Sequence, residues 1–280
     1  MGLISLLISL AAEKKLSSPF WQFNYAFSHY MQFAKHQDFH NKIKGTLYPI
    51  LLLAVPVTIT LIVLHLIQDS VLDLIVSTGL LIICFGCVKT RDTYKCYLKA
   101  AYQGENTTCD LHYQQLLTDK NLPDYGFGQT LIWLNYRYYI AVMMYFVVFG
   151  AAGAVFYRLL CSLDEQQKII KQEEPDSPAI TPVYGQILYW ADWLPVRIAS
   201  FGFMVVGHFS KALPVWLENI FEFHKKPQCV LIDVAQKSED IMVDKDDCTA
   251  EPCLLVRLAK RNVLLFLATV AMLTLSGILL

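Results

Sequence analysis

Residues 189–216, YWADWLPVRIASFGFMVVGHFSKALPVW, place an acid, a base, a histidine and two prolines inside a sequence that is otherwise apolar enough for a membrane. Pro195 is tolerated in the first turn of a helix, where its missing N–H would have no partner. We therefore predict that Asp192, three residues earlier, is the N-cap of a helix that ends before Pro214. At about 17 residues, this helix would barely equal the hydrocarbon thickness of a bilayer.

The polar residues of this stretch are candidate ligand contacts. Asp192, Trp193 and Arg197 would lie at membrane depth. An ionisable side chain at that depth is costly, so it marks a candidate functional site. An arginine that reaches from an interfacial helix to lipid head groups explains the same pattern without a ligand. His208 and Lys211 could meet an anion near the membrane surface or form an ordinary interfacial pair, so both alternatives stay open.

Composition indicates an integral membrane protein. The chain has 280 residues, of which 55% are hydrophobic and 17% are charged. A net charge of -1 provides no basic field for nucleic acid. Most of the eight cysteines lie in apolar spans or in expected cytoplasmic segments, so we expect no disulfide framework. Cys84 and Cys87 form a C-x-x-C inside the apolar run LIICFGCV, which favours packing over redox or metal chemistry.

The first 88 residues predict an amphipathic region followed by a membrane hairpin. Residues 1–44 combine an apolar start that is too short to span with a helix whose aromatic residues recur every three or four positions. Residues 45–88 hold two spans, the first interrupted by Pro49 and Pro56, so a kink must be compensated by neighbouring helices. Basic residues from Lys89 onward place the N-terminus in the cytoplasm under the positive-inside rule.

The rest of the chain continues the same alternation. Residues 89–137 read as a polar, helical cytoplasmic segment and 138–160 as a span with a small-residue face at Gly150, Gly153 and Ala154. We expect Tyr136, Tyr138 and Tyr139 to form an interfacial belt, with Arg137 available for lipid phosphates. The remaining segments are an outer loop, a spanning or re-entrant segment, a cytoplasmic segment and a final span, at 161–186, 187–216, 217–262 and 263–280.

Several functional motifs are missing. Gly202 and Gly207 have the spacing of a phosphate loop, but His208 and Phe209 stand where lysine and serine or threonine would hold phosphate and magnesium. No zinc-ligand set or nucleophile elbow is recognisable, so we predict no metal and no cofactor. The lack of an internal repeat lowers the case for a transporter.

Three segments carry a resemblance to a known family: LIWLNYRYY at 131–139, FGAAGAVFYRLL at 149–160, and above all DWLPVRIASFGFMVVGHFSKALPVW at 192–216. They resemble the AmpE family of bacterial inner-membrane proteins, which is linked to β-lactamase induction and cell-wall recycling. The similarity covers nearly the whole chain, including FHKKPQCVL and the C-terminal LTLSGILL. It implies a multi-pass, all-α inner-membrane protein with one domain, 1–280, and a bundle of four to five transmembrane helices.

AmpE is in turn similar to the CobD/CbiB membrane enzymes, which attach an aminoalcohol phosphate to a corrinoid carboxylate. The shared segments are matched here by Gly150 to Arg158, by Leu163 and Asp164, and by Trp193 to Arg197. The enzymes' glycine-arginine-aspartate-threonine motif has no counterpart, and Asn135 alone represents their acidic E-N-x-x-D pattern. The resemblance therefore implies a retained scaffold, with Arg158 and Arg197 as the natural partners of a phosphate or carboxylate.

The leading hypothesis is a regulatory membrane protein, non-enzymatic or cryptically enzymatic, that binds a cell-wall fragment or a phosphorylated small molecule. An amide-forming enzyme of the CbiB type and a transporter are the alternatives. The expected partners of the protein are the lipid bilayer and one such ligand. A membrane-protein partner is a further alternative, and nucleic acid is excluded. The candidate ligand contacts are Asp192, Trp193, Arg197, Asn135, Arg158, Asp164 and His208.

Overall fold

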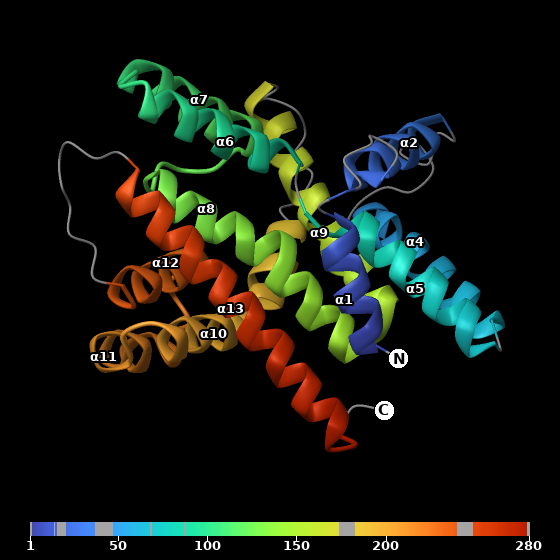
Figure 1. Cartoon of the computed structure of the whole chain (residues 1–280). Helices are drawn as coiled ribbons and strands as arrows, with labels where there is room; N and C mark the ends of the chain where they lie inside the picture. Colours follow the sequence, from blue (N-terminus) through green and yellow to red (C-terminus); the bar gives the residue numbers. More distant parts are fainter. Residues whose placement is uncertain are drawn as a thin grey trace. The chain divides into compact units, whose positions relative to one another are not determined.

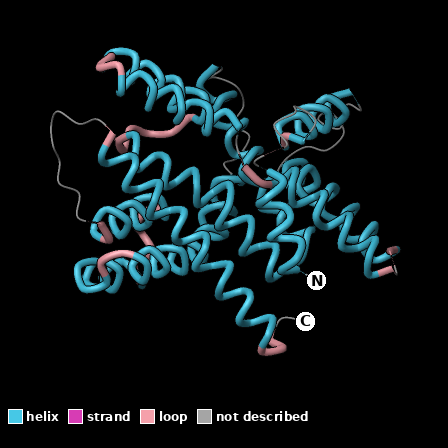
Figure 2. Tube along the Cα trace, in the orientation of Figure 1, coloured by secondary structure: helices cyan, strands magenta, loops and turns pink. Residues whose placement is uncertain are grey.

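The computed structural model describes residues 2–13, 15, 21–36, 47–67, 69–86, 88–173, 183–239 and 249–278. These residues form helices joined by short connections, and none of them lies in a strand (Figure 1 and Figure 2). The helices are α1 (Gly2–Glu13), α2 (Phe23–His36), α4 (Leu47–Leu66), α5 (Ser70–Cys84), α6 (Val88–Tyr102), α7 (Asn106–Lys120), α8 (Phe127–Asn135), the π-helix η2 (Tyr136–Ile140), α9 (Ala141–Glu173), α10 (Val183–Val206), α11 (Phe209–Ile220), α12 (Pro227–Lys237) and α13 (Ala250–Leu275). The all-α prediction is confirmed.

Three of the described helical segments are long and apolar enough to cross a membrane: Tyr48–Leu66, Phe127–Lys171 and Ala250–Leu275. The bent pair α5 and α6 becomes a fourth if it is counted as one span. The chain is therefore an all-α membrane protein with three to four candidate spans. The predicted bundle of four to five transmembrane helices agrees with this count at four, when α5 and α6 are taken as one span.

The described residues form two compact units, and each is considered by itself. The first contains residues from 1–86 and 141–191, and the second contains residues from 87–140 and 192–279. In the first unit, α9 packs against α4 and α5, while α1 packs against α5. In the second unit, α6 packs on α7, α8 packs on α12 and α13, and α11 packs on α12.

Tyr30 compensates for the proline inside α4, as the sequence required of a neighbouring helix. Pro56 has no N–H, so the carbonyl of Leu52 lacks its helical donor. The Tyr30 hydroxyl, on α2, donates to that carbonyl at 2.8 Å. Burial, with a smaller contribution from Tyr48, raises the pKa of Tyr30 to about 12.

Helix α9 bends sharply at Gly150 and folds back on itself. Gly150 has φ 68° and ψ -161°, a conformation outside the helical region that only glycine adopts readily. Tyr145 and Tyr157 would be about 18 Å apart along a straight helix, yet their ring centroids lie 4.9 Å apart. A Cβ on Gly153 would lie 2.5 Å from the Tyr145 carbonyl oxygen. The small residues therefore accommodate the turn within α9.

The helices here have bounds that the sequence did not indicate. Residues 138–160, expected to form a span, lie inside the candidate span Phe127–Lys171, whose helical course reverses at Gly150. Residues 161–186 were expected to form an outer loop, but α9 continues to Glu173 and α10 begins at Val183. Residues 161–173 contain three acidic residues and two lysines, a composition that suits the end of a helix as well as a loop, so composition alone does not separate the two.

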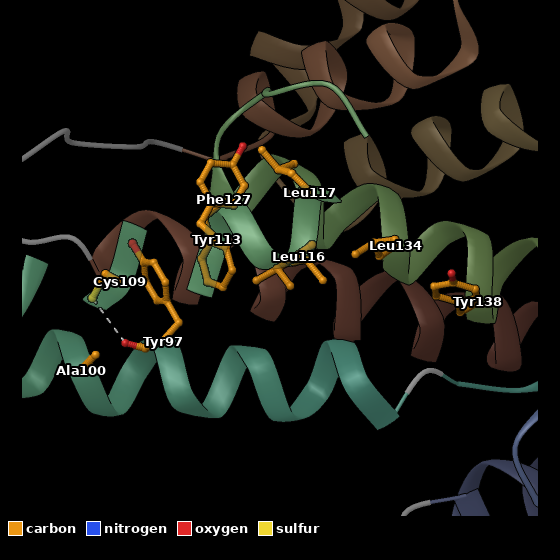
Figure 3. Packing of buried hydrophobic residues seen from close by; sticks show 10 residues of the cluster. Tyr97, Ala100, Cys109, Tyr113, Leu116, Leu117, Phe127, Leu134 and Tyr138 are labelled. Atoms are coloured by element: carbon orange, nitrogen blue, oxygen red, sulfur yellow. Dashed lines mark hydrogen bonds between the residues drawn. The ribbon is translucent and has the colours of Figure 1, made fainter. Parts of the chain in front are cut away.

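The polar segment before α8 is helical, as predicted, and it has an aromatic core. Tyr97 of α6 stacks on Phe127 of α8 with ring centroids 3.8 Å apart, and Tyr113 of α7 meets Phe127 edge-on at 5.7 Å. The Cys109 thiol donates to the Tyr97 carbonyl at 3.6 Å. Figure 3 shows these side chains gathered where α6, α7 and α8 meet. The core secures α8, which leads directly into η2.

Candidate functional site

Asp192 lies in the interior of α10 and is not its N-cap, because the helix begins at Val183. Pro195 is therefore inside the helix, where its missing N–H leaves the Ala191 carbonyl without a helical donor. The Tyr145 hydroxyl donates to this carbonyl at 3.1 Å. A hydroxyl from another helix lets α10 continue through its proline, and that long-range contact could not be read from local sequence.

Asp192 and Tyr136 form a buried polar pair in the second unit. Asp192 is 3% exposed, and the Tyr136 hydroxyl donates to its Oδ1 at 2.9 Å. Tyr136 is the first residue of the π-helix η2, a rare element that often occurs at functional sites. A buried carboxylate is costly unless it is hydrogen-bonded, and the tyrosine provides such a bond.

Trp133 and Arg137 extend this pair along the same helical run. The Trp133 and Tyr136 rings stack with centroids 5.2 Å apart. The central guanidinium carbon of Arg137 lies 5.5 Å from the centroid of Trp133, and both side chains are 2% exposed. We call Trp133, Tyr136, Arg137 and Asp192 the π-helix cluster. Its members combine a cation, a carboxylate and two aromatic rings away from solvent.

Four buried side-chain atoms on α8 have no hydrogen-bond partner in the part of the chain that the structure describes: Gln129 Oε1, Thr130 Oγ1, Trp133 Nε1 and Asn135 Oδ1. The Nε1 of Trp133 is a donor and the Oδ1 of Asn135 is an acceptor, and both are buried. Buried polar atoms are usually satisfied, so unsatisfied ones call for an explanation. A bound molecule with hydrogen-bonding groups would supply one.

The structure assigns the donors of Arg197 to backbone carbonyls. Its guanidinium donates to Trp193 O at 2.8 Å, Ile220 O at 2.8 Å, Asn219 O at 3.3 Å and Glu222 O at 2.7 Å. Asn219 and Ile220 are the last two residues of α11, and Glu222 follows two residues later. The C-terminal end of a helix is a position where carbonyls lack helical donors and a cation is favoured. Arg197, 4% exposed, thus joins α10 to α11.

Trp193 lies in a stack between a cation and a second ring. The guanidinium carbon of Arg197 is 4.1 Å from the Trp193 centroid. The Phe223 ring stacks on Trp193 with a centroid distance of 5.0 Å and an interplanar angle of 2°. The Nε1 of Trp193 is buried and has no hydrogen-bond partner among the described residues. The tryptophan therefore helps to secure the end of α11 through its ring.

Arg158 and Asp164 belong to the first unit, so they are described apart from Asp192. Arg158 is 3% exposed, and its guanidinium carbon lies 5.0 Å from the Phe23 ring centroid. Asp164 is also 3% exposed and forms an ion pair with Lys168 at 2.7 Å. Each charge is thus buried beside a partner in its own unit.

His208 and the two glycines before it serve packing between helices. His208 is exposed, occupies the N-cap position of α11, and donates its backbone N–H to Ser238 O at 2.7 Å. A Cβ on Gly202 would lie 2.1 Å from Asn262 Oδ1, and one on Gly207 would lie 2.3 Å from Ser238 O. These close approaches explain the glycine spacing without a phosphate.

The described residues contain no group of three metal-ligating side chains. Cys84 is buried with a free thiol in α5, while Cys87 lies outside the described residues. Trp133 and Tyr136 were not predicted as site residues, and Arg137 is buried instead of facing lipid phosphates. The available signal was an arginine inside the apolar run LIWLNYRYYI.

Comparisons with known proteins match the chain over its full length. A curated relative, Protein AmpE of Shigella flexneri, is 26% identical over 291 residues, and the match covers 99% of both chains. No solved structure matches the chain. Residues 1–280 match the family described as regulatory signalling modulator protein AmpE, and the chain therefore belongs to that family.

Proposed function

We propose that this chain modulates signalling by binding a small anionic ligand at the π-helix cluster. The ligand class is a cell-wall fragment or a phosphorylated small molecule, and the process is β-lactamase induction and cell-wall recycling. The observation that carries the proposal is the burial of Arg137 and Asp192, 2% and 3% exposed, beside a π-helix in a membrane protein. Retaining ionised groups away from water is costly, so such residues are functional candidates.

The chemistry of the cluster suits a ligand with both a charge and a ring. An arginine guanidinium binds carboxylate or phosphate through paired hydrogen bonds. The Trp133 Nε1 offers a further donor, and the Asn135 Oδ1 offers an acceptor. The Tyr136 and Trp133 rings, which stack on each other, form an apolar wall beside these polar groups. Asp192 would accept from a ligand hydroxyl or amine.

The other predicted contacts receive distinct roles in this proposal. Arg197 and Trp193 hold the end of α11 against α10, since Arg197 donates to four backbone carbonyls. Arg158 and Asp164 remain candidate contacts within the first unit. His208 remains a candidate for an anion at the membrane surface, where its exposure leaves it accessible.

For the location, we propose the bacterial inner membrane with a cytoplasmic N-terminus. The support is the cluster of Lys89, Arg91, Lys95 and Lys99 after the first hydrophobic helices. Basic residues near the ends of spans favour the cytoplasmic side.

The test is a thermal-stability screen of the detergent-purified protein against anhydromuramyl peptides, nucleotides with magnesium, and aminoalcohol phosphates. A specific ligand at one hundred times its Kd should add about 2.7 kcal/mol of stability. Asp192→Asn and Arg137→Lys should each reduce this gain, while Asp92→Asn, on the exposed ion pair of α6, should leave it unchanged.

Three outcomes separate the functions. Stabilisation by wall peptides that disappears in Asp192→Asn supports the proposal. Turnover of an aminoalcohol phosphate with an acid would favour the CbiB-type enzyme, and ligand flux into sealed vesicles would favour a transporter. If no compound stabilises the native chain, or if both variants respond like the wild type, the cluster is not the ligand site.

A further inference from the structure

We propose that the turn of α9 is a re-entrant tip that inserts into the hydrocarbon interior of the bilayer. Val148 and Phe149 would contact lipid acyl chains there. This lipid-facing tip is independent of any ligand of the π-helix cluster. The features that support it are the reversal at Gly150, the composition of the turn and the character of the helix that packs beside it.

The turn is exposed and lacks polar side chains. Val148 is 69% exposed and Phe149 is 64% exposed, whereas Ala151, Ala152 and Ala154 on the returning arm are buried. Residues 147–156 read VVFGAAGAVF, a run of ten without one polar side chain. Helix-reversing turns that face water are normally rich in polar residues and glycine or proline. An exposed turn of this composition needs an apolar environment.

The backbone of the turn is compatible with lipid. Irregular backbone is costly in hydrocarbon because its N–H and C=O groups lose water without gaining partners. Helical φ and ψ continue directly on both sides of Gly150, so the non-helical dihedral angles are confined to one residue, and the backbone groups without helical partners are those of the two helix ends that meet there. The Gly153 position lies against the Tyr145 carbonyl, which brings the two arms together and narrows the tip.

The neighbouring helix indicates which environment surrounds α9. α4 packs against α9 and is a candidate membrane span, of which only 17% is buried inside the structure. Its outward side chains include Ile59, Leu61 and Ile62, which are 55%, 51% and 58% exposed. A surface of this kind faces acyl chains in a membrane protein. The turn of α9 belongs to the same unit as α4 and is apolar as well. We therefore assign the turn the same lipid surroundings.

Phe149→Trp in lipid nanodiscs tests the proposal. Emission from the added tryptophan is obtained by subtracting the signal of the wild type, which has five tryptophans. Two matched controls have similar exposure: Ile62→Trp on α4 at 58% and Leu111→Trp on the polar helix α7 at 61%. Each variant is measured with lipids brominated along the acyl chain and with aqueous acrylamide.

We expect Phe149→Trp to behave like Ile62→Trp: blue-shifted emission, strong loss with brominated lipids, and little loss with acrylamide. Leu111→Trp should show the opposite pattern. Quenching of the Phe149→Trp signal by acrylamide alone would overturn the proposal. So would protection from both quenchers together with a dimer mass in detergent, since a second copy would then cover the tip. Val148→Trp provides the same readout if Phe149→Trp does not fold.

Discussion

At the scale of single residues, the backbone of Gly150 decides the course of α9. Its φ of 68° with ψ of -161° lies in a region that is essentially restricted to glycine. The space around it is not the constraint, since a Cβ there would meet nothing within 4 Å. Glycine is therefore required at position 150 for its backbone conformation. The sequence spacing alone had indicated a small-residue face for helix packing.

Gly150→Ala should lower the free energy of unfolding by about 1–3 kcal/mol, because the side chain strains the backbone in both arms of the turn. Gly79→Ala is the matched control: Gly79 lies inside α5, and its added Cβ would also meet nothing within 4 Å. That variant should be neutral or slightly stabilising. Thermal unfolding in detergent measures both, and equal stability of the two variants would contradict the strained turn.

Arg197 is a second residue whose role depends on geometry. Arg197→Lys keeps the charge but replaces a planar fork by a point charge, so it cannot reach carbonyls of residues 193, 219, 220 and 222 together. We expect a loss of about 2 kcal/mol or more, since a bond to a charged group contributes about 1.5–3 kcal/mol.

The control is Arg261→Lys, because Arg261 forms an ion pair with Glu239 at 3.2 Å and is 47% exposed. Its loss should be within about 1 kcal/mol. Chemical denaturation in mixed micelles compares the two. If Arg197→Lys were as stable as Arg261→Lys while ligand binding was lost, Arg197 would be a ligand contact and not a helix clamp.

The Tyr136–Asp192 pair makes a prediction that does not need the ligand. Tyr136→Phe should cost about 1.5–3 kcal/mol, because Asp192 would lose its hydroxyl donor in a buried position. When Tyr136→Phe is combined with Asp192→Asn, the loss of unfolding free energy should be smaller than the sum of the two single losses. A double-mutant cycle on unfolding midpoints provides the coupling energy. Strict additivity would mean that the hydrogen bond contributes nothing to stability.

At the scale of elements, two proline-containing helices rely on tyrosines from other helices. Tyr30 supplies the donor missing at Leu52 in α4, and Tyr145 supplies the donor missing at Ala191 in α10. Each hydroxyl replaces the N–H that the proline four residues later lacks. The prolines are visible in the sequence, whereas the compensating tyrosines are known only from the packing.

This arrangement predicts a rescue. Tyr30→Phe should destabilise the protein by about 1 kcal/mol, because the Leu52 carbonyl would lose its donor. In the Pro56→Ala background, the residue at position 56 regains an N–H for that carbonyl, so Tyr30→Phe should cost less. Thermal unfolding of the four proteins tests this coupling. An equal cost in both backgrounds would show that the hydroxyl does not serve the proline.

At the scale of the whole molecule, the distribution of basic residues predicts the membrane orientation. The connection at Gln103 and Gly104 is exposed, and a side chain at Gly104 would meet open space. A protease site inserted at Gly104 should be cut in inside-out vesicles and protected in right-side-out vesicles, because the lysines of α6 favour the cytoplasm. Cleavage in right-side-out vesicles alone would reverse the proposed orientation.

Composition and periodicity alone determined the class of this protein. The apolar runs before and around Pro56, the amphipathic segment near Phe23 and the polar helices after Lys89 predicted an all-α membrane protein, and the described helices confirm it. These features are local, because they depend on side-chain type at helical spacing and on bilayer thickness. The segments quoted at 131–139, 149–160 and 192–216 were also sufficient to indicate the family.

Only the tertiary structure decided the surroundings of the polar residues. Whether Arg137 faces lipid or lies buried, and whether Arg197 meets a ligand or the end of α11, depends on helices distant in sequence. The reversal at Gly150 likewise needs φ and ψ, because glycine is compatible with a straight helix and with a left-handed turn. Local sequence specifies which helices can form, while long-range hydrogen bonds and packing select how their buried charges are paired.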